Sequence, residues 1–200
     1  MPDIQARGPA ARLPTRWGNF QIMIFRDSQG LDHAAVFMGR LDDGEPVLCR
    51  IHSECLTGDA LGSLRCDCGP QLQRALELIA ARGRGCLLYM RQEGRGIGLF
   101  NKIRAYELQD QGMDTVEANL QLQLPADGRS YQLCAAMMRS LGFARVILMT
   151  NNPAKIEALQ SQGIEVTDRE PLETGANPYN EDYLRTKGDK MGHLLKEDGR

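Results

Sequence analysis

Short apolar runs alternate with segments of helical periodicity from residue 71 onward, and few folds accommodate that alternation. The first segment, 71–82, has apolar residues at positions 72, 75, 76 and 79, a spacing that places them on one helix face. Further helices are expected over 99–111, 131–141 and 152–162. A short buried strand is expected over Cys86–Met90, and further strands over Val146–Met149 and Ile164–Thr167. Strands that alternate with helices in this way predict an α/β fold with some parallel strand pairing.

The first third of the chain has a different pattern. Two apolar runs, Phe20–Phe25 and Ala34–Met38, flank a polar turn at 27–32, as antiparallel strands do. A further strand is expected over Val47–His52, after a second turn at 42–46. We therefore expect a single α/β domain with mixed sheets, in which antiparallel N-terminal strands precede the alternating strands and helices.

No repeat, low-complexity tract or linker interrupts the chain. Residues 1–16 are rich in Pro, Arg and Ala and have no periodicity, so we expect a flexible N-terminal arm there. The domain is expected to span 17–195, with a charged segment that is helical from Asn180 to Met191, and residues 196–200 are expected to form a C-terminal tail.

The charge balance argues against two classes of partner. The 24 basic and 26 acidic residues give a net charge of −2, whereas a nucleic-acid or polybasic membrane binder should have a strong basic excess. No apolar run reaches the roughly 18 residues of a bilayer-spanning helix, and the N-terminus lacks the apolar stretch of a secretory signal. We therefore expect a cytoplasmic protein that binds neither nucleic acid nor a membrane.

The six cysteines fall into two groups. Cys49, Cys86 and Cys134 lie inside apolar runs and are expected to be buried core residues. The other three lie in the polar, glycine-rich segment HSECLTGDALGSLRCDCG with the spacing Cys-x10-Cys-x-Cys. Clustered loop cysteines in a reducing compartment indicate a metal site, and thiolates suit zinc. We therefore expect Cys55, Cys66 and Cys68 to bind zinc.

The fourth zinc ligand decides what such a site does, and the spacing leaves two alternatives open. If His52 completes the site, the zinc is structural. If a water molecule completes it, the site is catalytic, because zinc lowers the pKa of that water toward about 7.

Three further segments have features of anion binding. RQEGRGIG (91–98) combines glycines with Arg91 and Arg95, and Lys102 and Arg104 follow on the expected helix. TNNPAK (150–155) places a helix N-terminus and a lysine after a strand. The third segment, Asp127-Gly128-Arg129, also fits a simple turn. A tight glycine turn and a plain capped helix are the corresponding alternatives for the first two.

Taken together, these segments resemble one family, GTP cyclohydrolase II, the first enzyme of riboflavin biosynthesis. The resemblance extends from about Leu13 to Leu195 and is most specific in RIHSECLTGDALGSLRCDCG (50–69), RQEGRGIGL (91–99), NKIRAYELQDQGMDTVEAN (101–119) and TNNPAK (150–155). It implies one catalytic zinc on the three cysteines, with water as the fourth ligand. In this family GTP loses C8 of its imidazole ring as formate and its β,γ-phosphates as pyrophosphate, and magnesium assists at the triphosphate. The product is a 2,5-diamino-6-ribosylamino-pyrimidinone 5′-phosphate.

The resemblance also implies a set of GTP contacts. Glutamate and glutamine side chains can pair with the N–H and carbonyl groups of guanine, and Arg95 and Lys155 can meet the phosphates. Carried over by motif, the contacts are Arg50, Ile51, His52, Ser53, Glu54, Gln71, Glu93, Gly94, Arg95, Thr115, Thr150 and Lys155.

Three residues are implied to be catalytic. In the family, the arginine that matches Arg129 is proposed as a nucleophile at the α-phosphorus, with the match of Asp127 as its proton acceptor. Because a guanidinium is almost never deprotonated, the alternative is that Arg129 stabilises phosphate charge while Asp127 orients it. Tyr106, in the motif KIRAY, favours the complete reaction over one that stops at a formamido intermediate.

The chain departs from the family pattern at one place, and its sequence leaves two other functions open. Where many members have Leu-Gly after the Glu-Ala-Asn motif, this chain has Leu122-Gln123, so the segment up to Asp127 is expected to lie differently. The other functions are a non-catalytic, zinc-stabilised nucleotide-binding module and a variant GTP cyclohydrolase of another pathway, such as that of a deazapurine antibiotic. The resemblance also implies a homodimer.

Overall fold

The computed structural model describes residues 4–125, 127–172, 174–175 and 177–181. The chain divides into two compact units. Unit 1 contains the described residues of 1–52, 72–91 and 130–172, and unit 2 contains the described residues of 53–71, 92–129 and 173–200.

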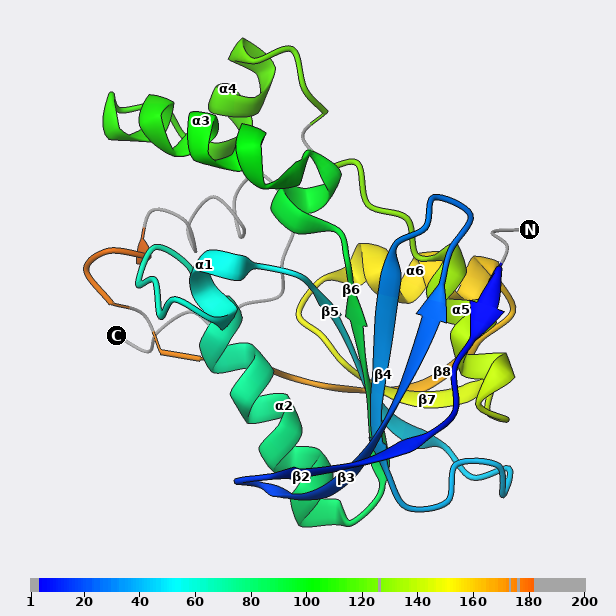
Figure 1. Ribbon diagram of the computed structural model, residues 1–200. Helices are drawn as coiled ribbons and strands as arrows, with labels where there is room; N and C mark the ends of the chain where they lie inside the picture. The colour runs from blue at the N-terminus through cyan, green and yellow to red at the C-terminus, as the bar shows by residue number, and fades with distance from the viewer. Residues whose placement is uncertain (1–3, 126, 173, 176, 182–200) are drawn as a thin grey trace. The chain divides into compact units, whose positions relative to one another are not determined.

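Unit 1 is built on one eight-stranded mixed sheet (Figure 1). The strand order is β1-β3-β4-β6-β5-β7-β8, and β2 also pairs with β3. The pairs β1–β3, β2–β3, β3–β4 and β4–β6 are antiparallel, whereas β5–β7 and β7–β8 are parallel. This confirms the expected α/β class. The strands are β1 (Ala6–Arg7), β2 (Ala11–Thr15), β3 (Gly18–Arg26), β4 (Asp32–Met38), β5 (Val47–Ser53), β6 (Gly85–Met90), β7 (Arg145–Met149) and β8 (Glu165–Glu170).

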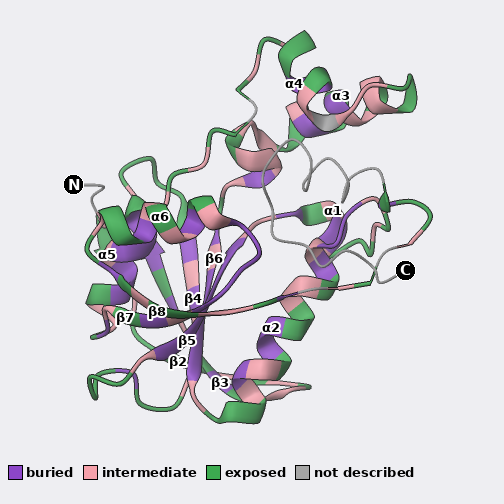
Figure 2. Ribbon diagram, turned by 180° about the vertical axis from the view of Figure 1, so that it is seen from behind, coloured by how far each residue is buried: buried purple, intermediate pink, exposed green. Residues whose placement is uncertain are grey.

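Helices cover both faces of this sheet. On one face, α2 (Cys68–Arg82) packs Ala75 and Ile79 against apolar strand residues, among them Leu48. On the other face, α5 (Gln132–Ser140) and α6 (Pro153–Ser161) enclose the larger core (Figure 2). Successive strand residues therefore face opposite cores. The larger core also contains Cys49, Cys86 and Cys134, all fully buried, which confirms the prediction for these three cysteines.

Unit 2 contains short helices. These are α1 (Leu56–Asp59), the first turn of α2, the 3-10 helix η1 (Glu93–Gly96), α3 (Gly98–Asp110) and α4 (Thr115–Gln121). A capping box begins α4: the Asp114 carboxylate accepts hydrogen bonds from the backbone N–H groups of Val116 and Glu117, and the Glu117 carboxylate accepts one from the N–H of Asp114.

The structure differs from the sequence expectations in several places. Residues 6–7 and 11–15 pair with β3 as strands, although we expected a flexible N-terminal arm over residues 1–16. The chain forms α1 and α4, which the periodicity did not predict, and α2 begins at Cys68 rather than at 71. The expectation of a single domain over 17–195 stays a prediction. The expected helix after Asn180 and the tail at 196–200 fall almost entirely outside the described residues.

No helix in the described part of the chain has both the length and the apolar character that crossing a membrane requires.

Candidate active site

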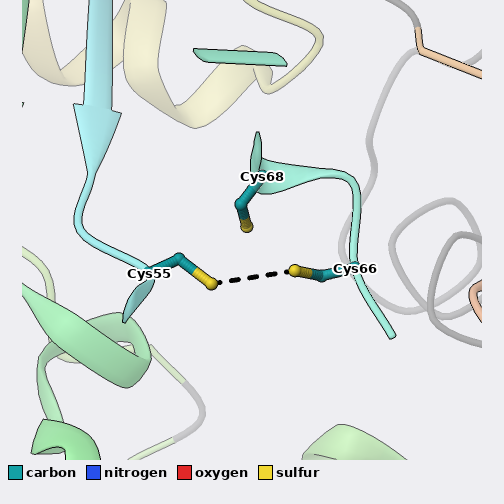
Figure 3. A group of neighbouring side chains, drawn as sticks. All are labelled: Cys55, Cys66 and Cys68. Atoms are coloured by element: carbon teal, nitrogen blue, oxygen red, sulfur yellow. Dashed lines mark hydrogen bonds between the residues drawn. The ribbon is translucent and has the colours of Figure 1, made fainter. Parts of the chain in front are cut away.

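The three loop cysteines come together in unit 2 (Figure 3). Cys55 immediately precedes α1, Cys66 lies in the following loop, and Cys68 is the first residue of α2. The sulfur atoms of Cys55 and Cys66 are 3.7 Å apart, and all three sulfurs lie within 4.8 Å of one another. Two thiolates on one tetrahedral zinc, with Zn–S bonds of about 2.3 Å, are about 3.8 Å apart. The cluster therefore has the donor atoms and the spacing of a zinc site.

Local backbone structure brings these sulfurs together. The Asp59 carboxylate accepts a hydrogen bond from the backbone N–H of Cys55 at 3.0 Å, which closes the short turn of α1. Gly58 lies directly against the cluster, because a Cβ added there would be 2.8 Å from the Cys66 sulfur and 3.2 Å from the Cys55 sulfur. A glycine is therefore required at this position.

A buried ion pair lies beside the cluster. The Lys102 ammonium donates to the Cys55 sulfur at 3.1 Å and to Glu93 Oε1 at 2.8 Å. Lys102 was expected among the cations that meet phosphate, but its ammonium is buried here instead. Burial lowers the pKa of Lys102, but the hydrogen bonds to Glu93 and Cys55 outweigh that effect and raise the pKa above its usual value.

The proton distribution over the sulfurs is uneven. Hydrogen bonds from Cys66 and Cys68, helped by Lys102, hold the pKa of Cys55 well below its ordinary value. Hydrogen bonding to Cys55 raises the pKa of Cys66 to about 11. Without metal, Cys55 is therefore the thiolate of the group, and it offers a metal ion a ready anionic ligand.

His52 was one of the two alternatives for the fourth zinc ligand. Among the described residues, the group of potential metal ligands contains the three cysteines and no histidine. The His52 ring lies in unit 1, where it is buried and stacks on Tyr89 with the ring centres 5.5 Å apart.

Tyr106 lies close to the cysteine segment of unit 2. Its hydroxyl is 3.4 Å from the hydroxyl of Thr57 on α1. The guanidinium of Arg65, the residue before Cys66, lies 4.7 Å from the centre of the Tyr106 ring. Burial raises the pKa of Tyr106, so its hydroxyl keeps its proton at neutral pH and can donate a hydrogen bond.

Asp127-Gly128-Arg129 is more than a turn. The Arg129 guanidinium donates through Nε and Nη2 to both oxygens of Asp127, with Nε–Oδ1 at 2.9 Å. The Gly128 N–H donates to the Arg95 carbonyl at 2.9 Å, so this loop lies against η1. Arg95 is held there in the left-handed region, with φ 62°. Two of the three predicted catalytic residues are thus joined, next to Arg95 of the glycine-rich segment.

A second group of predicted site residues comes together in unit 1. These are Arg50, Ile51, His52, Thr150 and Lys155, at the ends of the parallel strands β5 and β7 and at the start of α6. Lys155 Nζ donates to the Ile51 carbonyl at 2.9 Å, and Arg50 Nη1 donates to the Met149 carbonyl at 2.8 Å. Both cations are buried at the carboxyl edge of the sheet, where α/β proteins bind their ligands.

The remaining predicted contacts lie in unit 2. The Gln71 amide donates to Asp67 at 2.6 Å, and the Ser53 hydroxyl is buried without a hydrogen-bond partner among the described residues. Glu54 is partly buried, Gly94 adopts a left-handed conformation in η1, and Thr115 is the first residue of α4. Sequence reasoning missed the contact of Lys102 with Cys55 and that of Arg65 with Tyr106, because no spacing rule links residues so far apart.

This chain is similar to proteins of one family. The family model described as GTP cyclohydrolase II matches residues 6–171. A GTP cyclohydrolase-2 from Azotobacter vinelandii is 60% identical over 93% of this chain and 90% of that protein. One from Neisseria gonorrhoeae is 57% identical over 98% of this chain and 100% of that protein. Among solved structures, a two-domain 3,4-dihydroxy-2-butanone 4-phosphate synthase from A. baumannii aligns over 85% of this chain and 40% of that chain, with 20% identity and a TM-score of 0.44.

The family match covers the three zinc-spaced cysteines, the Asp127–Arg129 pair, Tyr106 and both groups of predicted GTP contacts. The two curated relatives extend that match to most of the chain, at identities far above the level at which a family assignment becomes ambiguous. The chain belongs to the GTP cyclohydrolase II family.

Proposed function

We propose that this chain is a zinc-dependent GTP cyclohydrolase II that catalyses the first committed step of riboflavin biosynthesis. It opens the imidazole ring of GTP and releases C8 as formate and the β,γ-phosphates as pyrophosphate. Hydrolysis of the two C–N bonds at C8 and of the phosphoanhydride bond consumes one water molecule for each bond. The product is 2,5-diamino-6-(ribosylamino)-pyrimidin-4-one 5′-phosphate.

The observation that carries this proposal is the cysteine cluster at zinc spacing in a member of this family. Cys55, Cys66 and Cys68 would hold the ion, and a tetrahedral zinc with three protein ligands keeps one position for water or substrate. When bound, zinc supplies Lewis acidity and acidifies a water molecule near neutral pH.

The remaining residues bind and orient GTP. Glu54 and Gln71 offer acceptors and donors to guanine, and Arg95 and Lys155 offer positive charge to the phosphates. The full proposed set is Arg50, Ile51, His52, Ser53, Glu54, Gln71, Glu93, Gly94, Arg95, Thr115, Thr150 and Lys155. The Glu93 carboxylate already accepts three hydrogen bonds, from Lys102, Gly94 and Leu56, so its contact with GTP is limited to one remaining lone pair or to its backbone.

Asp127, Arg129 and Tyr106 are the proposed catalytic residues. The two-nitrogen contact with Asp127 fixes the plane of the Arg129 guanidinium, which supports a role in stabilising phosphate charge. The protonated Tyr106 hydroxyl supports a role as hydrogen-bond donor at the opening ring. A magnesium ion on the triphosphate, a homodimer and a cytoplasmic location complete the proposal.

The deciding experiment identifies the products formed from GTP. Purified protein supplied with GTP, zinc and magnesium should release formate and pyrophosphate together. Chelator-treated protein and a Cys66→Ser variant should release no formate. Adding zinc back should restore formate release in the chelator-treated protein but not in the Cys66→Ser variant. Pyrophosphate without formate would contradict ring opening, and GTP binding without any product would indicate a nucleotide-binding module. A different pyrimidine product would indicate a variant cyclohydrolase.

A further inference from the structure

Lys102 lies outside the residues proposed to contact GTP, yet it is one of the few buried cations of the described chain. Its side chain is 10% exposed and that of its partner Glu93 is 9% exposed. Burying two charges is costly unless each finds compensating partners, so the pair calls for a physical reason. The reason must involve Cys55, because the Lys102 ammonium lies 3.1 Å from its sulfur.

Glu93 fixes the position of that ammonium. Its Oε1 accepts from Lys102 at 2.8 Å and from the backbone N–H of Gly94 at 3.0 Å, and its Oε2 accepts from the backbone N–H of Leu56 at 2.7 Å. One carboxylate therefore ties η1, the first residue of α1 and the lysine of α3 together. Leu56 directly follows Cys55, so the main chain of this metal ligand is held by the same group.

The charge of the zinc site explains why an ammonium group lies beside Cys55. Three thiolates around a zinc dication leave one net negative charge in a site where Cys55 and Cys66 are buried. A hydrogen bond from an ammonium to one of those thiolates offsets that charge and reduces the electron density that the sulfur donates to the metal. Partners of this kind around metal ligands control both metal affinity and the acidity of the site.

We propose that Lys102 is a positioning residue of the zinc site, which holds the Cys55 sulfur in place and offsets the negative charge of the three thiolates. Glu93 orients its ammonium. This inference rests on the zinc-binding function proposed above. It adds Lys102 and Glu93 as residues that position the ligands of that site.

The test measures the metal itself rather than turnover. Lys102→Met keeps an unbranched side chain that is one atom shorter, and it removes the charge and the donors. In competition with a chromophoric chelator, the full-length variant should bind zinc about 10- to 100-fold more weakly than the unaltered protein. With cobalt in place of zinc, the sulfur-to-cobalt charge-transfer band should move to longer wavelength, because the Cys55 thiolate has lost its hydrogen bond. Arg74→Met, which removes an exposed cation from α2, is the matched control and should change neither measurement.

A second variant tests whether Lys102 acts on the Cys55 sulfur or only neutralises the charge of Glu93. In Lys102→Met/Glu93→Gln the charge of Glu93 is removed together with that of its partner, so the fold should tolerate the change. We expect the cobalt band and the zinc affinity to stay altered in this double variant. Recovery of both to unaltered values would overturn the proposal, as would a Lys102→Met protein with unchanged affinity and band. If the unaltered protein itself binds neither metal, the zinc function fails instead, so the two failures can be told apart.

Discussion

Gln123 occupies a backbone conformation that is costly for any residue with a side chain. Its φ is 58°, in the left-handed region, directly after the last residues of α4. Its N–H donates to the Leu120 carbonyl, and that of Leu124 donates to the Asn119 carbonyl, both at 2.9 Å, which is a Schellman ending. Glycine is the usual residue at this position of a helix ending, so Gln123 adopts the glycine conformation without being glycine.

Replacing Gln123 by glycine should therefore stabilise the protein. The left-handed conformation costs a residue with a Cβ roughly 1–2 kcal/mol, and the greater freedom of glycine in the unfolded chain returns about 0.4–1 kcal/mol of that. We expect a net gain of about 0.5–1 kcal/mol in the free energy of unfolding, measured by urea denaturation. Gln121→Gly, within the last turn of the same helix, should instead lose about 0.5–1 kcal/mol. A lower urea midpoint for Gln123→Gly would contradict this account.

Arg129 and Asp127 form a fork that a lysine cannot reproduce. The guanidinium presents two parallel donors to one carboxylate, whereas an ammonium is a point charge on a flexible chain. We expect Arg129→Lys to lower kcat about 10²- to 10³-fold, the usual loss when an aligned charge donor is removed, with a smaller change in KM for GTP. Arg26→Lys, which alters a similar two-nitrogen fork with Asp32 at the surface, is the control and should leave kcat unchanged. A kcat within twofold of the unaltered value would show that the fork is not needed.

The candidate residues could be read from the sequence only where spacing carries chemistry. Cys55, Cys66 and Cys68 were predicted because closely spaced loop cysteines suit one metal ion, and their convergence is confirmed. The contact of Lys102 with Cys55 joins residues 47 positions apart, and the residue types alone do not predict it. That contact follows from how α3 packs within unit 2, which no local pattern encodes.

At the scale of elements, α1 shows how little chain is needed to build a metal site. This four-residue helix contributes Gly58, which lies where a Cβ would be 2.8 Å from the Cys66 sulfur. Gly58→Ala should push the sulfurs apart and weaken zinc binding about tenfold or more, as measured by chelator competition. Gly175→Ala, at a described position with open space and ordinary φ, should bind zinc normally. Equal zinc affinity of the two variants would show that the cluster tolerates the extra methyl group.

Elements with a buried apolar face were predicted well, whereas β2 and α4, which were missed, have no strong apolar pattern. The runs in β3, β4, β5, β6 and β7 and the periodic face of α2 carry their own signal, because each must pack against a core. β2 was missed because it pairs only with β3 and is largely exposed, so it needs no alternation and tolerates Pro14. For α4 a signal existed: Asp114 and Glu117 have the spacing of a capping box, which the periodicity alone did not reveal.

The division into two units could not be read from the sequence either. The chain passes between the units five times, so neither unit is a continuous stretch and no linker separates them. The passages after 52, 71, 91, 129 and 172 each fall inside or beside a strand, helix or loop. A domain boundary is visible in a sequence only where the chain crosses once through a polar, flexible segment.

Acid should affect the whole molecule in two separable steps. Zinc binding to thiols releases protons, and hydrogen bonding to Cys55 raises the pKa of the Cys66 thiol of the metal-free chain to about 11. Protons therefore already compete with the metal at neutral pH, and they compete more strongly as the pH falls. The carboxylates of the fold respond later. Burial raises the pKa of Asp27, but its hydrogen bonds to His33 and to the N–H groups of Leu31 and Gln29 outweigh this and lower it. A lowered pKa gives stability that is complete above the unfolded value of about 3.9 and is lost as the pH falls through the folded one.

We therefore expect zinc release, followed with a chromophoric chelator, at a higher pH than the loss of helical circular dichroism. Asp27→Asn removes a carboxylate whose contribution to stability is lost in acid. This variant should therefore alter the pH dependence of the dichroism and leave the zinc-release midpoint unchanged. The Lys102→Met variant should have the opposite pattern, with zinc release displaced to higher pH, because a thiolate without its ammonium partner takes up protons more readily. If zinc and dichroism are lost at one midpoint in all three proteins, the metal site and the sheet unfold as a single unit, and the two-step account is wrong.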